Sequence, residues 1–164
     1  GIDERATFSP KVANYPNGAH ACEVEIDPDT GEIDIQGYVI VDDVGTVLNP
    51  ALLKGQIHGG VAQGVGQAVM ERAVFDDSGQ NISGSFMDYT LPRAQDFTLF
   101  DVKSNPVPTE QNPLGVKGAG EAGTVGALPA VMNAIEHALR SAGVEMIEMP
   151  ASPERVWQAL QATS

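Results

Sequence analysis

The chain has 164 residues, of which 42% are hydrophobic and 19% charged, a composition that suits one folded domain rather than a disordered segment. Nine Lys and Arg against 22 Asp and Glu give a net charge of −13, which disfavours nucleic acid and anionic membrane surfaces as partners. Cys22 is the single cysteine, so an internal disulfide is excluded and a reducing cytoplasm is the expected location.

Targeting signals are not evident in this sequence. It shows neither a signal peptide pattern nor an apolar run of membrane-spanning length. Because the chain starts at Gly1 rather than Met, we expect processing, a tag remnant or a piece of a longer polypeptide.

The N-terminal part predicts an irregular lead-in followed by a β-hairpin. Residues 1–17 have no sustained hydrophobic period, whereas residues 20–26 alternate and residues 32–44 are rich in Ile and Val. Between the last two, residues 27–31 form a short polar turn in which Gly31 suits the left-handed position. These features predict an antiparallel strand pair.

A glycine-rich helix is predicted after Asn49-Pro50, since Asn is a favourable cap and Pro is tolerated at the first helical position. Its apolar stripe repeats at four-residue steps through Leu53, Ile57, Val61, Val65 and Val69. Interior glycines cost about 1 kcal/mol each relative to Ala. Their spacing allows another backbone or a ligand to come close, with Gln63 presented beside it. The alternative is a helix packed on a sheet with its glutamines in water.

The second half predicts further strands and then helices. Three short extended pieces are expected, at residues 73–75, 85–90 and 97–102. A stiff proline-containing connector at residues 105–113 leads into a helix with an apolar face from Leu128 to Leu139, and Ser152-Pro153 caps a last short helix. The predicted fold is α+β, an antiparallel or mixed sheet with two main helices packed on it, in a single domain over residues 1–164.

Residues 112–126 contain a single carboxylate, Glu121, set among glycines at the start of the long C-terminal helix. Glycines let the backbone approach another group closely. Residues 118–123 match G-x-G-x-x-G, but a loop rather than a strand precedes them and a carboxylate would repel a pyrophosphate, which argues against dinucleotide binding. Glu121 therefore has two interpretations, a functional carboxylate or a first-turn residue that suits the helix dipole.

Other catalytic patterns are not supported by the sequence. His20, His58 and His137 share no ligand spacing, so we expect no metal ligated by this chain's side chains. Neither Ser nor Cys22 lies in a nucleophile elbow, which removes support for hydrolase chemistry.

Several short motifs, each weak alone, occur together in a characteristic order. They are Tyr15-Pro16-Asn17-Gly18-Ala19-His20, Val41-Asp42-Asp43-Val44-Gly45, Asn49-Pro50, the run from Gly55 to Gly66, Gly84-Ser85-Phe86-Met87-Asp88-Tyr89, and Gly118-Ala119-Gly120-Glu121. In this order they resemble the C-terminal segment of the large subunit of molybdenum hydroxylases, the xanthine dehydrogenase, aldehyde oxidoreductase and carbon monoxide dehydrogenase-like family. The resemblance implies part of a second molybdopterin-binding domain.

The resemblance also implies roles for individual residues. Glu121 matches the glutamate beside the molybdenum, the family's general base in hydroxylation, and Gln63 matches a glutamine that contacts the pterin. Lys117 is expected among the cofactor-binding residues, where it either tunes Glu121 or pairs with an acidic neighbour. Backbone N–H donors near the molybdenum ligands are expected from Gly118, Ala119 and Gly120.

The cofactor implied is molybdopterin in its cytosine dinucleotide form, bound only in the complete enzyme. The implied partners are the remainder of the large subunit, or a larger molybdopterin subunit, together with iron–sulfur and FAD subunits. Ala122-Gly123 after Glu121, and Gly64 after Gln63, bring the chain closer to the carbon monoxide dehydrogenase-like group. These motifs do not separate aldehyde from N-heteroaromatic substrates.

Two alternatives from other classes stay open. One is a separate small subunit that contributes Glu121 to a partner's active site, and the other is a non-catalytic assembly or binding module that retains the fold.

Overall fold

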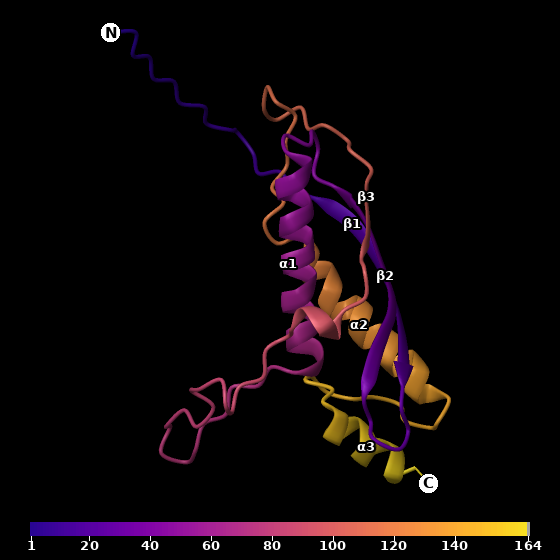
Figure 1. The fold of residues 1–164 in the computed structure, drawn as a ribbon. Helices are drawn as coiled ribbons and strands as arrows, with labels where there is room; N and C mark the ends of the chain where they lie inside the picture. Colours follow the sequence, from indigo (N-terminus) through magenta and orange to yellow (C-terminus); the bar gives the residue numbers. More distant parts are fainter. Residues whose placement is uncertain (164) are drawn as a thin grey trace.

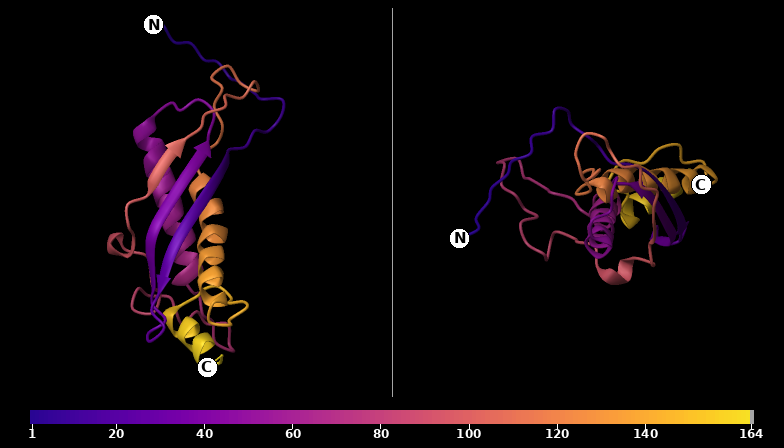
Figure 2. Two further views of the ribbon diagram at one scale, coloured as in Figure 1. Left: turned by 90° about the vertical axis from the view of Figure 1, so that its right-hand side faces the viewer. Right: turned by 90° about the horizontal axis from the view of Figure 1, so that it is seen from above.

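A computed structural model describes residues 1–163 of the chain (Figure 1). Its sheet has three strands in the order β1 (Asn17–Ile26), β2 (Ile33–Asp43) and β3 (Asp101–Ser104). β1 and β2 are antiparallel, while β2 and β3 are parallel. The two long helices, α1 (Pro50–Val69) and α2 (Ala122–Arg140), lie on the same face of this mixed sheet (Figures 1 and 2). The α+β fold with two main helices is confirmed.

Two smaller elements complete the described structure. A single 3-10 turn, η1 (Ala94–Asp96), precedes β3, and α3 (Pro153–Gln161) lies close to the turn that joins β1 to β2 (Figure 1). Ser152 precedes α3 as expected, but its side chain accepts no capping hydrogen bond. In the described residues, no helix is both long and apolar enough to cross a membrane.

The hairpin forms where the alternation predicted it. Gly31 has a φ of 76°, the left-handed conformation expected at the turn. β1 begins at Asn17, three residues before the alternating stretch, because the β1–β2 ladder continues to the pair Asn17↔Asp43. The inward side chains of β2 and the stripe of α1 supply much of the core; the large side chains that are fully buried are Tyr38, Ile40, Ile57, Ile135, Leu139, Val61, Val65, Val131 and Val156.

Packing between α1 and α2 explains part of the glycine content of α1. A Cβ on Gly60 would lie 2.9 Å from the backbone nitrogen of Thr124, and one on Gly64 would lie 2.5 Å from the Cβ of Ala127. α2 begins beside the middle of α1, where Gly123 lies against Ile57 and Thr124 against Gly60 (Figure 1). Close packing on a second backbone is therefore confirmed, and that backbone is the first half of α2.

Two of the predicted extended pieces are wrong. In residues 73–75 only Phe75 is paired, in an isolated bridge with Asn81. Residues 85–90 form turns, in which the N–H groups of Asp88 and Tyr89 both donate to the Ser85 carbonyl. Ser85 also donates its hydroxyl to Asp88, and such local bonds compete with strand pairing.

The third predicted strand is displaced along the chain. The expected residues were 97–102, whereas β3 covers Asp101–Ser104. Phe97 and Phe100 instead turn into an aromatic group whose rings meet edge to face, Phe100 contacting Tyr38 and His58 as well as Phe97. Burial of these rings fixes the segment before β3 in an irregular path.

Candidate functional site

The loop that leads to Glu121 rests on the chain just after β2. The N–H of Thr46 donates to the Gly115 carbonyl at 2.9 Å, and the N–H of Lys117 donates to the Val44 carbonyl at 2.9 Å. Gly45 and Gly115 both have positive φ, 65° and 68°, and a Cβ on Gly115 would lie 2.8 Å from the Pro108 side chain. Only glycine suits these two positions, so the base of the loop is held in one conformation.

A buried ion pair between the Lys117 and Asp43 side chains also holds this loop in place. The Lys117 ammonium lies 2.5 Å from Asp43 Oδ2, and both side chains are only about a tenth exposed. Asp43 Oδ1 accepts from the N–H groups of Gly45 and Val107. The hydrogen bond from Lys117, with those from Val107 and Gly45, lowers the pKa of the Asp43 carboxyl to about 2. Of the two alternatives for Lys117, the structure shows pairing with an acidic neighbour.

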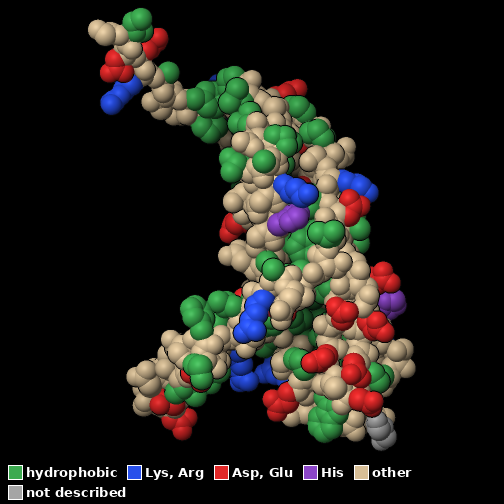
Figure 3. Space-filling view, in the orientation of Figure 1, with side chains coloured by type: hydrophobic (Ala, Val, Ile, Leu, Met, Phe, Trp, Pro, Cys, Tyr) green, Lys and Arg blue, Asp and Glu red, His purple; other side chains and the backbone are tan. Residues whose placement is uncertain are grey.

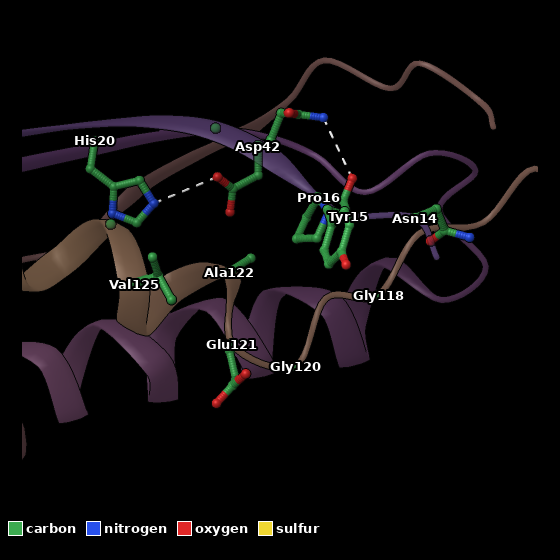
Figure 4. A pocket seen from close by; sticks show the side chains of 13 residues that line it. Asn14, Tyr15, Pro16, His20, Asp42, Gly118, Gly120, Glu121, Ala122 and Val125 are labelled. Carbon is green, nitrogen blue, oxygen red and sulfur yellow. Dashed lines mark hydrogen bonds and ion pairs between the residues drawn. The ribbon is translucent and has the colours of Figure 1, made fainter. Parts of the chain in front are cut away.

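Glu121 occupies the N-cap position of α2 through its backbone alone. Its carbonyl accepts from the N–H groups of Thr124 and Val125, each at 3.1 Å, and its side chain makes no capping bond. The carboxylate is exposed and, among residues 1–163, has neither a hydrogen-bond donor nor a salt-bridge partner. It points away from the His20 and Asp42 side chains (Figure 4).

Unpaired backbone donors precede this carboxylate in the chain. Within the described chain, the N–H groups of residues 118–121 donate to no other protein group. A Cβ added to Gly118 or Gly120 would meet nothing within 4 Å, so the space beside the loop is open on this side. Successive free N–H groups in front of a helix form an anion-binding arrangement, since the helix dipole adds to their partial charges.

Gln63 reaches the same region from α1. It is exposed, and its side-chain oxygen accepts a 3.3 Å hydrogen bond from the hydroxyl of Thr124, in the first turn of α2. The close contact of Gly60 with Gly123 and Thr124 brings the two helices together at this point. Gln63 and Glu121, separated widely in sequence, thus both lie beside the first turn of α2.

A cavity of about 520 Å³ lies between the lead-in, the start of β1 and the loop at the start of α2, and Gly120 and Glu121 are among the residues that line it (Figure 4). His20 and Asp42 line it, together with Tyr15, Gly118 and Val125. Its walls come from three separate segments, which the sequence alone did not predict to meet.

The wall of the cavity contains a buried polar group of three side chains. His20 Nε2 lies 3.5 Å from Asp42 Oδ1, and His20 Nδ1 lies 2.9 Å from the Tyr38 hydroxyl. Burial lowers the pKa of His20, which Asp42 partly opposes, and burial raises the pKa of Asp42, which His20 partly opposes. The arrangement suits a neutral imidazole that donates from Nε2 to Asp42. The second oxygen of Asp42 is buried without a hydrogen-bond partner among the described residues.

Sequence reasoning missed this group as a unit. From the sequence, His20 was considered only as a possible metal ligand, alongside His58 and His137. The available signal was the alternation itself, since His20 follows the same face as Cys22 and Val24, and Asp42 the same face as Tyr38 and Ile40. Polar residues on the apolar face of a hairpin must find partners. The ring also fixes α2, because a Cβ on Gly126 would lie 2.6 Å from it.

The structure thus brings the predicted site residues together at the start of α2. Gly118, Gly120 and Glu121 line one cavity, and Gln63 accepts a hydrogen bond from Thr124 in the first turn of α2. The Lys117 side chain is directed to Asp43 and contributes by holding the loop. The set offers a proton acceptor, an amide and several N–H donors. These groups suit a ligand that both donates and accepts hydrogen bonds.

Comparisons with known proteins agree with this arrangement. Residues 1–98 match the family described as the molybdopterin cofactor-binding domain. The chain belongs to this family. It is similar over 97% of its length, at 39% identity, to the nicotine 6-hydroxylase large subunit of Paenarthrobacter nicotinovorans, and over 98%, at 34% identity, to the carbon monoxide dehydrogenase large chain of Hydrogenophaga pseudoflava.

Solved structures give the same relationship in three dimensions. The chain superposes on a Cu,Mo-CO dehydrogenase structure with a TM-score of 0.90, at 32% identity and 95% coverage of this chain. For quinoline 2-oxidoreductase from Pseudomonas putida 86 the TM-score is 0.83, at 36% identity and 89% coverage of this chain. In each comparison the chain spans about a fifth of the relative's own length. The resemblance to a segment of the molybdenum hydroxylase large subunit is therefore confirmed.

Proposed function

We propose that this chain is one segment of a molybdenum hydroxylase large subunit and contributes the general base, Glu121, to its active site. The observation on which the proposal rests is the free Glu121 carboxylate at the start of α2, beside four backbone N–H groups without protein partners. The reaction is the hydroxylation of an aldehyde or of an electron-poor carbon in an N-heteroaromatic ring, with the oxygen taken from water. The names of the nicotine and quinoline relatives favour the heteroaromatic class.

The residues present fit a molybdopterin cofactor. A pterin offers acceptors for N–H groups and donors for an amide oxygen, and the chain presents the N–H groups of residues 118–120 and the side chain of Gln63. Gly118 and Gly120 leave the loop open on the side where a group has to approach. We propose the cytosine dinucleotide form, which release of cytidine monophosphate on hydrolysis of the complete enzyme would test.

When bound, the cofactor supplies a molybdenum centre that takes up two electrons from the substrate. The net change is R–H + H₂O → R–OH + 2 H⁺ + 2 e⁻, so a proton has to leave the water oxygen as it bonds to carbon. The Glu121 carboxylate accepts this proton at one of its two oxygens. Enclosure by the rest of the subunit would exclude water from this group.

Lys117 and Asp43 act in this proposal by holding the loop, since the ammonium is already paired at 2.5 Å. The complete enzyme is expected to include iron–sulfur and FAD subunits that remove the electrons, and the single cysteine of this chain suits a cytoplasmic location.

The substitution Glu121→Gln in the complete enzyme tests the proposal. Gln retains the size and one acceptor oxygen but does not take up a proton, so reduction by substrate in a single turnover should slow by about 10²–10⁴-fold. Cofactor content should be unchanged, because the backbone donors remain. Near-normal reduction at full cofactor occupancy would remove Glu121 from the mechanism. It would leave the carboxylate as a helix-dipole residue.

A further inference from the structure

Residues 71–93, between α1 and η1, form an arm that projects away from the body of the molecule (Figures 1 and 2). Its large apolar side chains face water to an unusual extent: Phe86 is 83% exposed and Met87 is 93% exposed. Phe75, Ile82 and Leu91 are also exposed. Apolar side chains gathered in this way mark an interaction surface.

The arm has a defined structure of its own. The Tyr89 hydroxyl donates to Glu71 at 2.6 Å and joins the two ends of the arm. Near the tip, the N–H of Ile82 donates to the Val74 carbonyl at 2.9 Å, and the N–H of Asp76 donates to the Gln80 carbonyl at 3.0 Å. These bonds hold the apolar side chains in place without burying them, so the arm is built to contact something outside this chain.

One side of α1 is also built for a close neighbour. Gly55, Gly59 and Gly66 lie opposite the buried stripe, because successive helical residues are turned by about 100°. At Gly66 a Cβ would lie 2.7 Å from Pro92 at the root of the arm, so the close neighbour of Gly66 belongs to this chain. At Gly55 and Gly59 a Cβ would meet nothing within 4 Å. These two glycines lower helix stability relative to Ala, and within the described residues no contact requires them.

The arm and this side of α1 belong to one face of the molecule. The lead-in and the arm project to the same side, at opposite ends of α1 (Figures 1 and 2). The space-filling view shows the outline hollowed between them, with apolar side chains on the arm (Figure 3). We define the inner face as the arm, Gly55, Gly59 and the lead-in, residues 1–16.

We propose that the inner face is buried against the remaining part of the same large subunit, which inserts a convex surface between the arm and the lead-in. The occupant presents apolar pockets to Phe86 and Met87 and packs its backbone on Gly55 and Gly59. The inference rests on the proposed function, in which this chain is a segment of a large subunit, because relatives extend about five times as far as this chain. A second copy fits less well, since a two-fold contact would place one hollow face against another.

Oxidation of the native methionines in the complete large subunit tests the proposal. Met87 is 93% exposed and Met146, in the loop after α2, is 72% exposed, so in this chain alone hydrogen peroxide should oxidise Met87 at least as fast as Met146. In the complete large subunit, Met87 should oxidise about 10-fold or more slowly relative to the same subunit in denaturant, as measured by mass spectrometry of its peptide. Free methionine in the solution calibrates the oxidant dose.

Each outcome of this experiment decides the proposal. Protection of Met87 that persists at dilutions where the large subunit is monomeric supports it. Unprotected Met87 overturns it, as does protection that is present only in a dimer or only with the other enzyme subunits. The oxidation measurement requires neither cofactor nor turnover. Its result therefore does not depend on whether Glu121 is the general base.

A substitution on the helix links the two halves of the inner face. Gly59→Leu adds a side chain where the occupant's backbone is expected, so it should raise the oxidation rate of Met87 toward the denatured value and leave Met146 unchanged. An unchanged Met87 rate in that variant would show that the arm and α1 do not meet one common partner, and would overturn the continuous face.

Discussion

Two consecutive aspartates at the end of β2 hold the Glu121 loop from opposite sides. Asp43 pairs with Lys117, just before residues 118–121, and Asp42 pairs with His20, whose ring packs on Gly126 in the first turns of α2. Their side chains diverge because neighbouring residues in a strand point to opposite faces. The position of Glu121 therefore depends on a short stretch of β2 that does not contact it.

Replacing Asp43 by Asn should make the fold less stable in a pH-dependent way. The folded pKa of about 2 lies below the usual value near 3.9, so the charged form of Asp43 stabilises the fold above about pH 4. This contribution is lost as the pH falls through about 2. The difference in melting temperature between the native protein and Asp43→Asn should thus be full at pH 5–7 and shrink toward pH 2.

A matched control is Asp101→Asn, which removes the partner of Lys103. These two side chains are 53% and 62% exposed, and an exposed pair contributes little. Equal melting temperatures for native protein and Asp43→Asn at neutral pH would contradict the structural role of the Asp43–Lys117 pair.

At the scale of the elements, the contact between α1 and α2 sets the geometry of the site. Gly60→Leu should be strongly destabilising, because the first added carbon would already lie 2.9 Å from the Thr124 nitrogen. Overpacking typically costs about 1–3 kcal/mol. Gly55→Leu on the open side of α1 serves as the control in this chain and should not lower the melting temperature. An unchanged melting temperature for Gly60→Leu would show that α2 moves to accommodate the added side chain without loss of stability.

The hydrophobic periods predicted the hairpin and both long helices because their own side chains form the core, as Val61 and Ile135 do. The pieces at 73–75 and 85–90 were mistaken for strands because their apolar residues resemble strand residues but are exposed here. A sequence pattern does not show whether an apolar side chain is buried within the chain or against another one. Gln63 and Glu121 were predicted from the motif resemblance, whereas their proximity follows from Gly60 and Gly64, which only the structure assigns to the α1–α2 contact.

For the whole molecule, the open side of the site is as informative as the residues that form it. Glu121, Gly118 and Gly120 are exposed, and Gln63 is exposed on the neighbouring helix. A group held only by these residues would keep most of its surface in water, and each side chain would have to be ordered on binding. A catalytic base in a wet site also loses the benefit of a dry environment.

The isolated chain should therefore neither retain molybdopterin nor catalyse hydroxylation, although it contains Glu121. Molybdenum and pterin measured on the purified chain should be far below one per molecule, whereas the complete large subunit prepared in parallel should approach one. Both samples contain the segment with Gln63 and Glu121. The difference between them therefore isolates what the rest of the subunit supplies, which is enclosure of the cofactor and burial of the inner face. Stoichiometric molybdenum with intact pterin on the isolated chain would show that residues 118–121 and Gln63 are sufficient for binding. The chain would then be a complete binding module in its own right.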